Sequence, residues 1–334
     1  MRGQQEGVEP GVGETPLLLV DGVLVKLECA NPTGSVKDRI ADFMLRQAAA
    51  RGDLFRGDTV VEATSGNTGI ALSFVARRRG YKALIFMPEH MSQERRSLLR
   101  ALGAKVRLTP QSEGFEGPIR ARDAYRGRDG YYLPDQFTNP DNTLCHYETT
   151  GREILRQLGE SQRLDAFIAG TGTGGTLMGV GHALREEFPD LKLVAVEPEE
   201  SAVMSGCEAS DHLIQGIGDG FVPDLVDMSQ VDEVAQVSSA EAIAESNDIR
   251  LRHGYCVGIS AGANMAVAAR LRDRGLAVAT LWPDCSDRYG SLGLAPPFSE
   301  GVTCPHRSEC LERAAELLGS PLEVPADQLP GQRV

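Results

Sequence analysis

Short β-branched runs alternate with stretches of helical periodicity along most of this chain. The clearest set starts with the run Thr59–Ala63, continues as a helical pattern that reaches Arg79, and returns as an apolar run over 83–87. A second helical pattern over about 92–102 leads into a third run over 105–108. Such alternation is typical of strand–helix units with parallel strands. The first half of the chain is therefore predicted to contain a βαβαβ unit.

The second half shows the same alternation. An apolar run over 166–169 passes through a glycine-rich segment into a helical pattern that ends near Glu187, and a further run follows over 193–196. Residues 263–272 are predicted to form a helix and residues 277–281 a strand. Parallel sheets bind ligands where strand C-termini meet helix N-termini. We therefore expect an α/β fold with two lobes and a cleft between them.

The composition narrows the class of protein. The chain has 334 residues, 41% of them hydrophobic and 24% charged, which is enough to bury a substantial core. Its formal net charge of -13 disfavours nucleic acid and anionic membrane surfaces as partners. No apolar run reaches the roughly 18–20 residues of a membrane span, and residues 1–14 are polar and glycine-rich, unlike a signal peptide. We expect a cytoplasmic protein without a nucleic-acid or membrane partner.

The cysteines do not form a disulfide framework. There are 7, an odd number, and they are scattered along the chain, so most are expected to be reduced thiols. Cys304, His306 and Cys310 lie close together in the sequence, but no fourth ligand is evident and no metal site is expected. Residues 301–334 are read as a C-terminal tail whose order the sequence does not predict.

A glycine-rich turn over 170–176 joins a predicted strand to a predicted helix. Its backbone N–H groups, the helix dipole and the hydroxyls of Thr173 and Thr176 can hold a phosphate. The same glycines satisfy the dinucleotide pattern G-x-G-x-x-G, and Glu197 stands at the end of the next strand, where a ribose-binding acid is expected. This segment alone leaves both interpretations open.

Lys37 follows a turn-rich approach over 31–36 and begins a helical pattern. The helix dipole disfavours a cation at this position by a few tenths to about 1 kcal/mol, so the pKa of the lysine should fall. A neutral amine is the form required for Schiff-base chemistry and for general-base catalysis. An exposed lysine on a first helical turn remains the alternative.

A second polar turn, over 64–69, also joins a strand to a helix. Its N–H groups and hydroxyls suit a carboxylate, and Asn67 could bind a ring hydroxyl. The alternative is a polar helix cap without a ligand.

Residues 258–262 match the pattern G-x-S-x-G, which raises a serine-hydrolase interpretation with Ser260 as nucleophile. That chemistry needs a later histidine, and the chain offers only His306 after Ser260. A hydroxyl that faces a cofactor nitrogen is the preferred role.

Together, the segments 31–39, 64–69, 170–176 and 258–262 resemble the signature segments of the cysteine-synthase and cystathionine β-synthase family, in that family's order. Further similarity lies at 87–88, 91–96, 136–140, 146–151, 216–218 and 287–289. The resemblance implies a two-domain, fold-type II pyridoxal-phosphate enzyme, similar to the tryptophan synthase β chain. It also implies a smaller mobile domain over 39–143, a larger domain over 14–38 and 144–300, and a homodimer.

The resemblance implies a role for each matching residue. Lys37 would carry pyridoxal phosphate covalently, Asn67 would bind its 3′-oxygen and Ser260 its pyridine nitrogen. A neutral serine at that nitrogen favours β-elimination over transamination. The phosphate would be held by Gly172, Thr173, Gly174, Gly175 and Thr176, and the substrate carboxylate by Thr64, Ser65, Gly66, Thr68 and Gln136.

The implied activity is that of a transferase that converts O-acetyl-L-serine and sulfide to L-cysteine and acetate, with Lys37 as general base. Use of O-phosphoserine, formation of cystathionine, and a diaminopropionate-type β-replacement remain open, as does association with serine acetyltransferase. A non-catalytic regulatory homologue and an NAD-binding oxidoreductase are alternatives from other classes.

Three features depart from the family pattern. The connection between residues 17 and 26 is short, so a strand or lid element there is expected to be trimmed. Asp219 stands where many cysteine synthases carry a small residue, and its charge would disfavour a doubly anionic O-phosphoserine and favour O-acetylserine or an amine-bearing substrate. Cys285 is interpreted as a small buried thiol, with a reactive thiol as the alternative.

Overall fold

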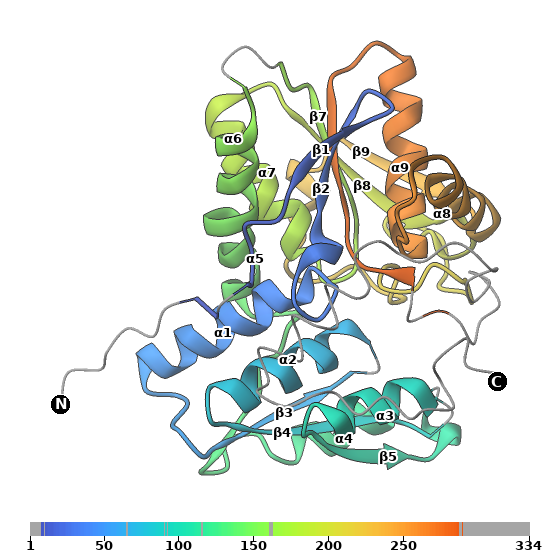
Figure 1. The fold of residues 1–334 in the computed structure, drawn as a ribbon. Helices are drawn as coiled ribbons and strands as arrows, with labels where there is room; N and C mark the ends of the chain where they lie inside the picture. Colours follow the sequence, from blue (N-terminus) through green and yellow to red (C-terminus); the bar gives the residue numbers. More distant parts are fainter. Residues whose placement is uncertain are drawn as a thin grey trace, which may run out of the picture.

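The protein contains two separate sheets, each flanked by helices (Figure 1). The computed structural model describes residues 8–9, 11–64, 66–89, 91, 93–114, 116–159, 163–286 and 289. None of the helices within these ranges is long and apolar enough to cross a membrane. Helix α1 (Lys37–Arg51) lies between the two sheets and packs against helices from both parts of the molecule.

The larger sheet has the strand order β1-β2-β10-β7-β8-β9. Its strands are β1 (Leu17–Val20), β2 (Val23–Leu27), β7 (Ala166–Gly170), β8 (Lys192–Pro198), β9 (Glu233–Val237) and β10 (Val278–Trp282). All pairs are parallel except β1 with β2. Alternate residues of β7 and β8 face opposite core clusters, one shared with α8 (Ser239–His253) and α9 (Ile259–Asp273), the other with α7 (Gly175–Glu187). Burial on both faces explains why these strands read as continuous apolar runs.

The smaller sheet has the order β5-β4-β3-β6, with all strands parallel. These are β3 (Thr59–Ala63), β4 (Lys82–Pro88), β5 (Lys105–Thr109) and β6 (Tyr131–Tyr132). Helices α2 (Asn67–Arg78) and α3 (Gln93–Ala101) cover one face together with part of α1, and α4 (Glu116–Asp123) covers the other. The remaining helices are α5 (Pro140–His146), α6 (Arg152–Gln157), the π-helix η3 (Tyr147–Gly151), and the 3-10 turns η1 (Glu28–Ala30), η2 (Gln111–Glu113), η4 (Glu199–Ser201) and η5 (Met228–Gln230).

The predicted elements are confirmed with small changes of boundary. The one substantial difference is α9, which begins at Ile259 and not near residue 263, because the G-x-S-x-G segment itself forms the first helical turn. The short connection after residue 17 is a tight hairpin between β1 and β2. Asp21 and Gly22 form its turn with φ values of 49° and 78°, the left-handed pair of a type I′ turn.

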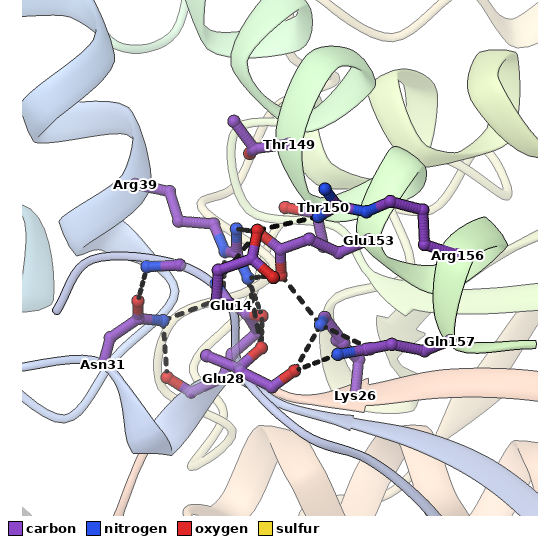
Figure 2. Close-up of polar contacts among 12 residues, drawn as sticks. Glu14, Lys26, Glu28, Asn31, Arg39, Thr149, Thr150, Glu153, Arg156 and Gln157 are labelled. Atoms are coloured by element: carbon purple, nitrogen blue, oxygen red, sulfur yellow. Dashed lines mark hydrogen bonds and ion pairs between the residues drawn. The ribbon is translucent and has the colours of Figure 1, made fainter. Parts of the chain in front are cut away.

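A buried ionic cluster anchors the start of α1 to β2 and α6 (Figure 2). Arg39 pairs with Glu28 and with Glu153, both at 2.6 Å, and Lys26 pairs with Glu153 at 2.8 Å. Burial by itself would raise the pKa of Glu153, but hydrogen bonds from Arg39 and Lys26 outweigh it and lower that pKa to about 2. The cluster therefore contains two cations and two carboxylates. Its Arg39 lies two residues after Lys37 on α1.

Candidate active site

A cleft of about 540 Å³ opens between the two sheets, at the C-terminal ends of their strands. Thr64 follows β3, the glycine loop follows β7, and Asp284 follows β10. The cleft is lined by most of the predicted site residues: Lys37, Thr64, Gly66, Asn67, Thr68, Gln136, Gly172, Thr173, Gly174, Thr176, Asp219 and Ser260. Gly175 begins α7 directly after this lining, and Ser65 lies outside the described residues.

Four helices begin at this cleft: α1 at Lys37, α2 at Asn67, α7 at Gly175 and α9 at Ile259. In none of the four does the residue before the helix make a side-chain cap hydrogen bond, while at α1 the Ser35 hydroxyl accepts the Lys37 N–H at 3.4 Å. Uncapped helix N-termini carry backbone N–H groups without partners and a partial positive charge. The cleft is therefore built to bind anions.

The conformation and packing of the glycine loop require glycine at several positions. Gly174 has φ +83°, a left-handed conformation that favours glycine. A Cβ atom on Gly172 would lie 2.5 Å from the carbonyl oxygen of Gly216, and one on Gly175 would overlap Oδ1 of Asn142. These positions cannot carry side chains without a shift of the loop. Glycine therefore fixes the shape of this loop at the N-terminus of α7, where backbone N–H groups can bind a phosphate.

Helix α5 supports the hydroxyls of this loop from behind. Asn142 Nδ2 donates to Thr173 Oγ1 at 2.9 Å, and His146 Nε2 lies 3.1 Å from Thr176 Oγ1. The other ring nitrogen, Nδ1, lies 2.9 Å from Thr150 Oγ1. Burial lowers the pKa of His146 to about 3, so the imidazole is neutral and links the two hydroxyls. In the sequence, residues 146–151 stand out only through the family resemblance, and no motif points to Asn142.

Lys37 differs from every other lysine of the chain. Lys26 is fully buried in its ion pair with Glu153, which requires the charged form. The exposed lysines are Lys82, Lys105 and Lys192. Lys37 is half-buried, faces the cleft, and has no ion pair with any described residue. It is the lysine available for amine chemistry in this site.

The environment of Lys37 favours a neutral amine. Burial is the main cause and lowers its pKa, while the carboxylates of Asp219 and Asp284 act in the opposite direction. The N-terminus of α1 adds to the lowering. The Lys37 pKa is therefore lowered, as predicted. The main cause is burial in the cleft, and the helix dipole that motivated the prediction is an additional one.

A polar wall faces this lysine from the smaller sheet. Thr68 Oγ1 donates to Gln136 Oε1 at 2.7 Å, and the Gly66 backbone N–H donates to Thr64 Oγ1 at 3.3 Å. Thr68 and Gln136 are buried, at 3% and 6% exposure. The structure therefore brings these four residues together at the N-terminus of α2, where a carboxylate would be favourable.

Ser260 lies on the first turn of α9, 3% exposed, and lines the same cleft. No hydrogen bond joins it to a histidine within the described ranges, so the hydrolase interpretation lacks its base. Asn67 also lines the cleft, and its Nδ2 donates to Asp284 Oδ2 at 2.7 Å. Asp284 is a buried carboxylate that was not among the predicted site residues. Its only signal was a Pro-Asp pair after a predicted strand.

Glu197, the acidic residue that the dinucleotide interpretation requires, is not available to bind a ribose. Glu197 is buried at the end of β8, and its carboxylate accepts hydrogen bonds from the backbone N–H groups of Met204 at 2.7 Å and Ser205 at 3.1 Å. It does not line the cleft. A ribose would have to displace these contacts.

Two thiol predictions have different outcomes. Cys285 is half-buried and its thiol lies 3.6 Å from the Cys29 carbonyl oxygen, outside the lining of the cleft. The expected small buried thiol is confirmed only in part, because the residue keeps intermediate exposure. Cys304, His306 and Cys310 lie outside the described residues, with the rest of the tail.

A phosphate cradle, a polar wall for a carboxylate and a lysine with a lowered pKa together define the site of a fold-type II pyridoxal-phosphate enzyme. The comparison of the sequence with family models agrees. The chain belongs to the family described as "Pyridoxal-phosphate dependent enzyme", whose model matches residues 8–278.

The similar proteins narrow this class. The cysteine synthase of Staphylococcus aureus (strain N315) is 45% identical over 294 residues, covering 85% of this chain and 94% of the relative. The crystal structure of cysteine synthase from Entamoeba histolytica superposes with a TM-score of 0.81 at 33% identity, covering 96% of this chain and 98% of that one. The O-acetylserine dependent cystathionine beta-synthase of Helicobacter pylori gives 0.79 at 36% identity, covering 85% and 96%.

Proposed function

We propose that this protein is a cysteine synthase that transfers sulfide to the β-carbon of O-acetyl-L-serine, producing L-cysteine and acetate. The observation that supports the proposal is that Lys37, residues of the glycine loop and the hydrogen-bonded Thr68–Gln136 pair line the same cleft. The 45% identity to a cysteine synthase supports the choice of reaction.

The residues that would hold pyridoxal phosphate are those of the resemblance. Lys37 would carry it covalently, residues 172–176 would bind the phosphate, Asn67 the 3′-oxygen and Ser260 the pyridine nitrogen. When bound, this cofactor supplies an electron sink that makes the α-proton and the β-substituent of an amino acid labile.

The chain's own groups then bind the substrate and move its proton. Residues 64–66, Thr68 and Gln136 bind and orient the substrate carboxylate at the N-terminus of α2. Lys37 Nζ takes the α-proton as general base, and burial lowers its pKa, which favours the neutral form that this task requires.

The architecture supports a closing motion. The smaller domain over 39–143 would move relative to the larger domain over 14–38 and 144–300. The reason is that the polar wall around Thr68 and the glycine loop over 172–176 are attached to different sheets. Closure on the substrate carboxylate would exclude water. A homodimer, a cytoplasmic location and association with serine acetyltransferase belong to the same proposal, through the resemblance.

Asp219 would select the leaving group. It lines the cleft, where burial raises its pKa and the nearby Lys37 opposes this rise. In its ionised form it would repel the phosphate of O-phosphoserine more than a neutral acetyl group. Replacement by alanine should therefore raise the turnover of O-phosphoserine relative to O-acetylserine, measured as cysteine formed from each donor with sulfide. An unchanged ratio in Asp219→Ala would contradict this role.

The proposed function is tested with the purified protein loaded with pyridoxal phosphate. Addition of O-acetylserine should shift the visible absorption of the bound cofactor, and sulfide should restore it with release of cysteine. Lys37→Ala is the matched control and should release no cysteine, because it lacks the general base. If homocysteine or an amine restores the spectrum while sulfide does not, the nucleophile is wrong and cystathionine or diaminopropionate-type synthesis replaces it. A spectrum that ignores O-acetylserine refutes the proposal.

A further inference from the structure

Asp284 lies where three parts of the site meet. It is 1% exposed and follows β10 at the floor of the cleft. Its backbone bridges to Ser35 in the loop before Lys37, and its carbonyl accepts the Gly258 N–H at 2.9 Å, at the start of α9. The residue therefore connects the lysine loop with the helix that carries Ser260.

The side chain of Asp284 reaches the third part, the N-terminus of α2. Oδ2 accepts Asn67 Nδ2 at 2.7 Å and also the Tyr289 hydroxyl. A Cβ atom on Gly258 would overlap Oδ1, so the first turn of α9 packs directly against the carboxylate.

We infer that Asp284 is a positioning residue of the cofactor pocket, which orients the amide of Asn67 and stabilises positive charge on Lys37. The inference rests on the proposed function, because it assumes that these two residues contact the cofactor. A carboxylate can only accept a hydrogen bond, so its contact turns the nitrogen of the Asn67 amide toward Asp284 and fixes the plane of the group.

The charged groups around Lys37 explain why Asp284 would affect its pKa. Burial lowers the pKa of the amine, and Asp219 and Asp284 are the carboxylates that oppose this lowering. Asp38, the next residue along α1, accepts the Thr33 backbone N–H at 2.6 Å and is held by that loop. His146 is neutral because burial lowers its pKa to about 3. Ser260 is uncharged. Asp135 also lines the cleft but pairs with Arg122 and Arg126, so among the described residues Asp219 and Asp284 are the carboxylates that act on Lys37.

The test uses Asp284→Asn, which keeps the shape and removes the charge. The cofactor-free protein is reductively methylated with 13C-formaldehyde, and the dimethyl-lysine signals are titrated by NMR. The chain has few lysines, and loss of one signal in Lys37→Arg assigns Lys37. The pKa of Lys37 should fall by about 1 unit in Asp284→Asn. Tyr289→Phe keeps both the charge and the Asn67 contact, and should leave that pKa unchanged.

A second measurement tests the link to Asn67. The affinity of the cofactor-free protein for pyridoxal phosphate, followed by fluorescence, should fall about tenfold in Asp284→Asn, the size of one lost hydrogen bond. Because Asp284 acts through Asn67, the double variant with Asn67→Ala should bind no more weakly than Asn67→Ala alone. Asp219→Asn should lower the Lys37 pKa without this loss of affinity.

Some outcomes would overturn the inference. An unchanged Lys37 pKa in Asp284→Asn would remove the electrostatic role, and additive losses in the double variant would remove the action through Asn67. Thermal melting of each cofactor-free variant verifies that it is folded. The NMR titration needs neither substrate nor cofactor, so it can fail or succeed independently of cysteine synthase activity.

Discussion

Replacing Glu153 should destabilise the protein far more than replacing an exposed carboxylate. Glu153 is 3% exposed and accepts hydrogen bonds from Arg39 Nη1 at 2.6 Å and Nη2 at 2.7 Å, and it pairs with Lys26 Nζ at 2.8 Å (Figure 2). Glu153→Gln keeps the size but leaves the fully buried ammonium of Lys26 without this carboxylate. Removal of one partner from a buried ion pair costs about 3–5 kcal/mol.

The pKa of Glu153 leads to a similar magnitude. A fall from 4.5 to about 2 on folding corresponds to about 3 kcal/mol of stabilisation. Because the folded-state pKa is depressed, this stabilisation is fully present above pH 4.5 and is lost as the pH falls toward 2. Glu153→Gln should therefore be about 3 kcal/mol less stable at pH 7, and its stability should depend less on pH between these values.

Urea unfolding of the cofactor-free protein, followed by circular dichroism at several pH values, measures both effects. The matched control is Glu241→Gln, which removes an exposed ion pair with Arg270, 2.5 Å long and with side chains 41% and 47% exposed. Exposed pairs contribute about 0–1 kcal/mol. If Glu153→Gln lost no more stability than this control, the cluster would not anchor α1 as argued.

Three further predictions concern the cofactor pocket. Borohydride reduction of the loaded protein, followed by peptide mapping, should place the cofactor on Lys37; a label on Lys26 would contradict the assignment. Gly175→Ala should cost about 1–3 kcal/mol by overlap with Asn142 and weaken pyridoxal-phosphate binding roughly tenfold, whereas Gly159→Ala, with open space around it, should bind normally. In urea unfolding, the wild type should lose stability as the pH falls below 6.5, because His146 is protonated in the unfolded chain but has a pKa of about 3 in the native protein. His146→Gln should lose less stability over the same pH range. An equal loss in both proteins would refute the buried neutral ring.

Much of the fold and part of the site could be predicted because the responsible interactions are local. The glycine loop over 170–176 and the start of α1 at Lys37 depend on backbone freedom and helix termini within a few residues. The continuous apolar runs predicted the bounds of β7, β8 and β10 closely, since these strands are buried on both faces. The start of α9 was predicted too late because the glycine-rich pattern lowers helix propensity. In the structure the helix begins at Ile259, because burial of its first turn overrides that preference.

The sequence by itself determined the class of chemistry: a lysine at a helix start, two anion-binding turns and a serine at a third helix start, in an α/β fold. Only the tertiary structure decided which distant groups surround them. Asn67 and Asp284 meet although they are 217 residues apart, and His146 supports Thr176 from another helix. The order of strands in a sheet differs from their order in the chain, so contacts across strand ends leave no periodic pattern in the sequence.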